Sequence, residues 1–265
     1  PLALLQVTDR FIYLQEGDVV RLSKGGEVDI FDALGERQSR PVQTFEHGDG
    51  AASKEGFRHF MLKEIHEQPQ VIAATLEGRL SERHVLVNSF GNEAETLFKQ
   101  VKQVHIIACG TSYHAGMVAR YWLEKYAGLP TQVEVASEYR YREVVVPADT
   151  LFVTLSQSGE TADTLAALRF AKQQGYLGSL AICNVPGSSL VRESDLTLMT
   201  QAGPEIGVAS TKAFTTQLVA LMLLSLSLGR VKGMDETREA EVVQALRSLP
   251  RLIGQVLGLD GVIET

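Results

Sequence analysis

Short apolar runs alternate with amphipathic segments from about residue 92 to residue 229. The apolar runs lie at 104–109, 132–136, 150–155, 179–184 and 196–200, and helical spacing of apolar residues covers 112–127, 160–174 and 210–229. Parallel neighbours in a sheet need a connection of a dozen or more residues, which a helix can supply. The pattern therefore predicts an α/β domain with a five-stranded parallel sheet flanked by helices.

The beginning of the chain has a different pattern, in which short apolar runs are separated by glycine turns. The runs lie at 2–8, 10–15, 18–23 and 27–32. Three or four strands alone are too few for a stable domain. We therefore predict strands of a truncated domain at 1–40, a polar, glycine-bearing linker at 41–56, a helical lead-in at 57–91, the parallel-sheet domain at 92–232 and a further helix at 233–265. Within the lead-in, Pro69 predicts a break between two helices.

Two loops of the parallel-sheet domain are candidates for a binding site. In a flavodoxin-like sheet of strand order 2-1-3-4-5, ligands bind where the order reverses, at the carboxyl ends of the first and third strands. Here those strands end in "ACGTSYHAG" (108–116) and "LSQSGETAD" (155–163), and both loops lead into helices. Helix N-termini attract anions through free N–H groups. The hydroxyls of Thr111, Ser112, Ser156, Ser158 and Thr161 add donors, and Gly110 and Gly159 allow close backbone approach, so the loops predict a phosphate site.

Simple helix capping is the alternative explanation of the same residues. Ser156 or Ser158 would then be the N-cap, and Glu160 and Asp163 would favour the helix dipole. Both carboxylates would repel a phosphate unless their side chains point away. Because two such loops meet at one predicted place, the phosphate site is favoured. Lys212, after the fifth strand, is either a cation near the same ligand or a plain surface charge.

The composition of the chain limits the kinds of partner that it is expected to bind. The chain has 265 residues and a net charge of −7, and it lacks the basic patch expected of a nucleic-acid surface. Nucleotide motifs such as G-x-x-x-x-G-K-[ST] are missing, so we predict no nucleotide cofactor. His59 and His66 have no sequence partners for a metal. The two cysteines, Cys109 and Cys183, each follow an apolar run and are expected to be thiols in a reducing cytoplasm.

One apolar segment, 213–229, reaches only the lower limit of length for a membrane span and contains Thr, Gln and Ser. We therefore predict a buried helix and no membrane partner. Its apolar residues cover more than one face, so we expect another layer, either a further domain or a second subunit, to bury part of it.

Four motifs carry a resemblance to a known family. They are "CGTSYHAG" (109–116), "TLSQSGETADT" (154–164), "SLAICNVPGSSLVRESD" (179–195) and "EIGVASTKAFTTQ" (205–217), with "KEIHEQP" (63–69) preceding them. They resemble the first sugar-isomerase (SIS) domain of the glutamine–fructose-6-phosphate aminotransferases. The resemblance runs through essentially the whole chain, and residues 1 to about 45 look like the last strands of that family's glutaminase domain.

The resemblance implies a substrate and a set of binding residues. In that family the SIS loops bind the phosphate of fructose 6-phosphate, and the matching positions here are Ser112, Ser156, Gln157, Ser158 and Thr161. The positions that match the sugar lining are Cys109, Gly110, Thr111, Val208 and Ser210. The family takes ammonia from glutamine to make glucosamine 6-phosphate. The resemblance also implies a cytoplasmic homodimer without a cofactor.

Two departures from the family change the expectation for chemistry. The family begins with a cysteine, where this sequence has Pro1, and it places its proton-transfer base in a second SIS domain beyond Thr265. We therefore expect no catalytic residue in this chain. Glu160 and Glu205 are better explained by the helix dipole and by a loop surface. The main hypothesis is therefore the sugar-phosphate-binding part of such an aminotransferase. The alternatives to it are a non-catalytic SIS module that senses a sugar phosphate and a purely structural α/β protein.

Overall fold

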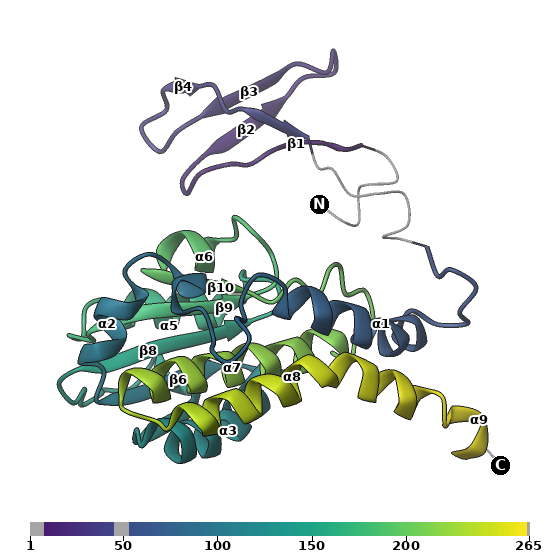
Figure 1. Cartoon of the computed structure of the whole chain (residues 1–265). Coiled ribbons are helices and arrows are strands. Elements are labelled where there is room, and N and C mark those ends of the chain that lie inside the picture. The colour runs from purple at the N-terminus through teal and green to yellow at the C-terminus, as the bar shows by residue number, and fades with distance from the viewer. Residues whose placement is uncertain (1–7, 45–52, 264–265) are drawn as a thin grey trace. The chain divides into compact units, whose positions relative to one another are not determined.

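The computed structural model describes residues 8–44 and 53–263. The chain divides into two compact units, Pro1–Gly56 and Phe57–Thr265 (Figure 1). The domain boundaries predicted from the sequence remain predictions, although the division between the units falls where the lead-in was expected to begin.

The first unit consists of short antiparallel strands. They are β1 (Arg10–Ile12), β2 (Val19–Leu22), β3 (Val28–Phe31), β4 (Arg37–Gln38) and β5 (Val42–Thr44). β1 pairs with β5, and β2, β3 and β4 form a three-stranded sheet. Arg40 lies 2.8 Å from Asp18, and this hydrogen bond lowers the pKa of the Asp18 carboxyl to about 2. The strand predicted at 2–8 lies outside the described residues except for Thr8, and β5 occupies part of the predicted linker.

The second unit contains the predicted parallel sheet. Its strands are β6 (Gln103–Ala108), β7 (Thr131–Val135), β8 (Thr150–Ser156), β9 (Gly178–Cys183) and β10 (Leu196–Met199). They lie in the order β10-β9-β8-β6-β7, and every pair is parallel. Counted from β6 as the first strand, this is the 2-1-3-4-5 order, so the flavodoxin-like fold prediction is confirmed.

Helices cover both faces of this sheet (Figure 1). They are α1 (Phe60–Leu76), η2 (Val87–Phe90), α2 (Ala94–Gln100), α3 (Gly110–Trp122), η3 (Leu123–Ala127), α4 (Ala136–Tyr139), α5 (Ala162–Ala171), α6 (Ser189–Glu193), α7 (Lys212–Val231), α8 (Glu236–Leu257) and α9 (Asp260–Ile263). Strand residues alternate between two cores. Ile106 packs with α1, α3 and α7, whereas its neighbour Ile107 packs with α4 and α5.

The predicted helix break at Pro69 is wrong, because α1 continues through this residue. A proline removes the N–H that would bond to the carbonyl four residues earlier, here that of Ile65. The side-chain amide of Gln68 donates a hydrogen bond to this carbonyl at 3.0 Å. The adjacent glutamine therefore supplies the donor that the proline lacks.

Helix α7 forms the centre of one face, and its neighbours belong to the same chain. It packs against α1 and α3, and Val243 and Leu246 of α8 join the same core. Among the described residues α7 is long and apolar enough to cross a membrane, but 67% of its apolar window is buried inside the chain, as in a core helix. Helices α1, α3 and α8 supply this cover, and the expectation that a further domain or a second subunit buries another part of the helix stays a prediction.

A buried polar cluster lies on the opposite face of the sheet. The His105 side chain is 6% exposed, and its Nε2 lies 3.1 Å from a carboxylate oxygen of Glu134. Its Nδ1 lies 2.8 Å from the hydroxyl of Tyr176, which accepts a hydrogen bond from Tyr139. Burial lowers the pKa of His105, although the Glu134 carboxylate opposes this shift and Arg142 pairs with that carboxylate.

This cluster predicts that the chain loses stability on mild acidification. Because the folded-state pKa of His105 is lowered, below about pH 6.5 the unfolded chain binds a proton that the folded chain does not. The free energy of unfolding, measured with urea, should therefore fall between pH 7.5 and pH 5.5. His105→Gln should flatten this slope, whereas the same change at the exposed His114 should not. An unchanged slope in the His105 variant would contradict the prediction.

Candidate functional site

The two hydroxyl-rich loops begin at neighbouring strands. β6 and β8 pair in parallel, with Ala108 opposite Leu155, so their carboxyl ends are adjacent. The prediction that the two loops lie side by side is therefore confirmed. Cys109 is the extended N-cap of α3, and its Sγ lies 3.9 Å from the hydroxyl oxygen of Thr164 on α5. Gly110 has a φ of +56°, a conformation that favours glycine.

The second loop is a tight turn held by its own hydroxyls. Ser156 is buried, and its Oγ accepts a hydrogen bond from the Gly159 N–H at 3.0 Å and lies 3.2 Å from the Thr161 hydroxyl. The Ser158 Oγ accepts from the Glu160 N–H at 3.2 Å. Since the Ser158 oxygen is used as an acceptor, its own proton is available for a ligand. Thr161, rather than Ser156 or Ser158, is the N-cap of α5, so the capping alternative named the wrong residues.

Both acidic residues beside this turn have partners on other elements. Glu160 accepts a hydrogen bond from the Ser189 N–H at the start of α6, at 2.7 Å. Asp163 pairs with Arg140 at 2.7 Å. These contacts answer the objection that their charges would repel a phosphate. Arg140 escaped the sequence analysis because no local motif marks it.

Ser112 forms a hydrogen bond with a side chain of α7. Gln217, 2% exposed, donates a side-chain hydrogen bond to the Ser112 Oγ at 3.0 Å. The Ser112 proton is then available to a ligand, as for Ser158. A glutamine within an apolar helix was the only sequence signal for this contact, and the sequence analysis did not use it. Thr111 is exposed beside Ser112.

The turn and the neighbouring strand are joined by Asn184. Its backbone N–H donates to the carbonyl of Gln157 at 3.3 Å. Its side-chain oxygen accepts from the N–H of Ala202 at 2.7 Å, and its amide donates to the carbonyl of Gly203 at 2.7 Å. Asn184 therefore connects the predicted phosphate turn with the loop that follows β10.

That third loop carries Val208 and Ser210. Val208 is fully exposed, and the Ser210 hydroxyl donates to Glu205 at 3.0 Å, so their surroundings are solvent and the loop itself, not the phosphate turn. The other oxygen of Glu205 accepts from the N–H groups of Thr211 (2.9 Å) and Ala213 (3.0 Å). The interpretation of Glu205 as a plain loop-surface residue is therefore wrong, because this carboxylate caps α7.

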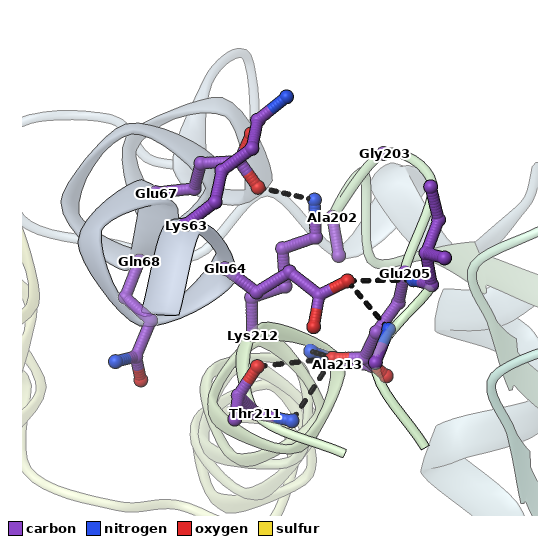
Figure 2. Close-up of polar contacts among 12 residues, drawn as sticks. Lys63, Glu64, Glu67, Gln68, Ala202, Gly203, Glu205, Thr211, Lys212 and Ala213 are labelled. Atoms are coloured by element: carbon purple, nitrogen blue, oxygen red, sulfur yellow. Dashed lines mark hydrogen bonds and ion pairs between the residues drawn. The ribbon is translucent and has the colours of Figure 1, made fainter. Parts of the chain in front are cut away.

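The surface-charge alternative for Lys212 is also wrong. Its side chain is 4% exposed, and its Nζ lies 2.6 Å from a carboxylate oxygen of Glu67 on α1 (Figure 2). It is therefore a buried charge paired with α1, and its place near the ligand stays a prediction. Among the described residues, no group of three His, Cys, Asp or Glu side chains could hold a metal ion.

Comparison with known proteins identifies the class. Residues 97–227 match the SIS domain family. The five-stranded parallel sheet and its loops are the body of this match, so this part of the chain is a SIS domain. A putative phosphosugar isomerase from Silicibacter pomeroyi has the same fold, with a TM-score of 0.61 and 27% identity over 74% of this chain and 56% of that one.

The particular family follows from relatives that match nearly the whole chain. The chain is 65% identical to a glutamine–fructose-6-phosphate aminotransferase [isomerizing] from Pseudomonas syringae and 62% identical to that from Pseudomonas aeruginosa, each over 99% of this chain. The C-terminal domain of the Francisella tularensis glucosamine-fructose-6-phosphate aminotransferase has a TM-score of 0.78 and 52% identity, covering 80% of this chain and 60% of that one. The chain is therefore similar to these aminotransferases over nearly its whole length, as its motifs predict, and it spans 43% of the length of these two Pseudomonas relatives.

Proposed function

We propose that this chain is the part of a glutamine–fructose-6-phosphate aminotransferase that binds fructose 6-phosphate. The observation that carries the proposal is the pair of loops at the adjacent ends of β6 and β8. In these loops Ser112 and Ser158 each use their oxygen as an acceptor and keep a proton for an anion. The relatives that match 99% of the chain favour this function over a sensor module.

Different groups of residues would hold the phosphate and the sugar. The phosphate would lie at the N-termini of α3 and α5, held by the side chains of Ser112, Ser156, Gln157, Ser158 and Thr161 and by backbone N–H groups. A phosphate held by neutral donors needs no lysine or arginine. Cys109, Gly110 and Thr111 would line the sugar from one side, and Val208 and Ser210 from another.

No residue of this chain is assigned to proton transfer. Glu160 and Glu205, the nearest acidic candidates, each accept backbone N–H groups, at 2.7 Å from Ser189 and at 2.9 Å from Thr211. These contacts give both carboxylates a structural role in holding backbone N–H groups. This supports a binding role for the chain within an enzyme that takes ammonia from glutamine and forms glucosamine 6-phosphate.

The assembly and location of the protein are part of the same proposal. The resemblance suggests a homodimer in the cytoplasm. Exposed apolar side chains at the end of α8, in the turn after it and on α9 support a further contact; they are Leu252, Val256, Leu259, Val262 and Ile263. A group of exposed apolar residues favours a protein partner.

Removing one hydroxyl tests the proposed site. Ser158→Ala should weaken fructose 6-phosphate binding by about 1.5–3 kcal/mol, the contribution of a hydrogen bond to a charged group. The wild-type chain should bind with a Kd of about 1 mM, because an interaction of about −4 kcal/mol is left after the costs of association. Titration followed by NMR measures both values.

The matched control is Ser248→Ala on α8, whose hydroxyl only donates to the carbonyl of Ala245. It should bind fructose 6-phosphate like the wild type. Unphosphorylated fructose should be unaffected by either change. Equal losses for fructose and fructose 6-phosphate in the Ser158 variant would overturn the assignment of this turn to phosphate.

A further inference from the structure

The loop that carries Val208 and Ser210 is held by a carboxylate from outside the SIS domain. Glu64 lies on α1, which precedes the matched residues 97–227. Its Oε1 accepts two hydrogen bonds, from the N–H of Ile206 at 2.6 Å and from the N–H of Gly207 at 2.9 Å (Figure 2). These two residues come directly before Val208, so α1 fixes the backbone at the entrance to this loop.

Glu64 and Gly207 fit each other closely. A Cβ atom on residue 207 would lie 2.5 Å from the Glu64 Oε2 and 3.6 Å from the Cα of Met61. Glycine is therefore the residue that allows the loop backbone to reach the carboxylate. Since both contacts of Glu64 are to backbone N–H groups, they determine where the loop runs, whatever side chains it carries.

A contribution to stability does not explain why a carboxylate is buried at position 64. The residue is 2% exposed, and its Oε2 is buried with no hydrogen-bond partner among the described residues. A buried carboxylate oxygen without a partner costs free energy, and such groups in folded proteins call for a functional explanation.

Two carboxylates together leave little of the loop free. Glu64 holds residues 206 and 207, and Glu205 holds the Ser210 hydroxyl and the Thr211 N–H. Only Val208 and Ala209 lie between these anchors, and both are exposed. The loop is therefore presented to solvent in one conformation, which lowers the entropy lost when a ligand contacts it.

We propose that Glu64 is a positioning residue for sugar recognition, acting through the backbone of the loop that carries Val208 and Ser210. This inference rests on the proposed function, because it takes the bound ligand to be a sugar phosphate. The phosphate turn at 156–161 is held by hydrogen bonds within the turn, and its link to the loop after β10, through Asn184, reaches residues 202 and 203 and not the two residues that Glu64 holds. Glu64 thus affects contacts to the sugar and leaves those to the phosphate unchanged.

The test compares two ligands and three variants of the chain. Glu64→Ala should raise the Kd for fructose 6-phosphate about tenfold, equivalent to about 1.4 kcal/mol, and leave the Kd for inorganic phosphate within about twofold. Glu64→Gln keeps an oxygen that can accept both N–H groups and should retain most of the binding of fructose 6-phosphate. Ile72→Ala, a buried change on the same helix, controls for destabilisation alone and should change neither Kd.

Amide hydrogen exchange gives a readout that is independent of any ligand. In Glu64→Ala the N–H groups of Ile206 and Gly207 should exchange faster, whereas those of the phosphate turn should not. Unchanged exchange at these two residues, or equal losses for fructose 6-phosphate and phosphate, would overturn the positioning role. If the wild-type chain binds phosphate and fructose 6-phosphate equally well, the role in sugar recognition fails while the phosphate site stands. If it binds neither, the proposed function fails and this inference with it.

Discussion

Gly159→Ala should destabilise the chain by about 2–5 kcal/mol. Gly159 has a φ of +67°, and a Cβ atom there would lie 2.6 Å from the Cβ of Ser188 and 2.7 Å from the Sγ of Cys183. The left-handed backbone costs a residue with a side chain about 1–2 kcal/mol, and overpacking adds about 1–3 kcal/mol. Chemical denaturation measures the loss. Binding of fructose 6-phosphate should fall as well, because Gly159 lies between Ser158 and Thr161 in the predicted phosphate turn.

Gly175→Ala separates the cost of the left-handed backbone from the cost of overpacking. Gly175 also has a positive φ, +80°, but nothing lies within 4 Å of the position of its Cβ. Its replacement should cost only the backbone contribution of about 1–2 kcal/mol and should leave fructose 6-phosphate binding unchanged. Equal destabilisation by the two alanines would show that the contacts with Ser188 and Cys183 do not limit residue 159.

Glu67→Met should destabilise the chain by about 3–5 kcal/mol. Lys212 is buried, and Glu67, 2.6 Å away, is its charged partner. Removing one member of a buried ion pair leaves the other charge uncompensated, which is the source of this cost. Lys63 lies 3.7 Å from the other oxygen of the same carboxylate, so the change also removes a charged neighbour of Lys63. Urea denaturation at neutral pH measures the effect.

Lys212→Met is the matched variant, because it replaces the other member of the ion pair with the same residue, methionine. The Glu67 side chain is 26% exposed and keeps Lys63 as a neighbour, so the loss should be only about 1 kcal/mol. The double variant should be less destabilised than Glu67→Met, because the buried charge of Lys212 is removed together with its partner. A loss for Lys212→Met as large as that for Glu67→Met would contradict this explanation.

The sheet and its site could be predicted because their signals are local. Each strand is a run of apolar residues, and the helices predicted at 112–127 and 160–174 lie between such runs, so a parallel sheet follows from the chain alone. The loops at 108–116 and 155–163 carry their hydroxyls and glycines within a few residues of the strand ends. The general topology of such sheets then brings these loops together.

Local patterns failed where a side chain outside the pattern supplies a hydrogen-bond or charge partner. Pro69 predicts a break, but the Gln68 amide bonds to the free carbonyl. Lys212 looks like a surface charge because its partner, Glu67, is 145 residues away in sequence. Glu205 looks like a loop residue until its carboxylate is seen to accept N–H groups at the start of α7. In each case the polar group is satisfied by a contact that no spacing rule predicts.

The sequence by itself determined the α/β class, the parallel sheet, the two hydroxyl-rich loops and the resemblance to the aminotransferases, since these depend on local periodicity and on contiguous motifs. Only the tertiary structure decided which charges are buried and which backbone groups they hold. The contact of Glu64 with Ile206 spans 142 residues, and that of Gln217 with Ser112 spans 105. Such pairs form because packing α1 and α7 against the sheet removes water from polar groups, which must then find partners in whichever segment the fold places beside them.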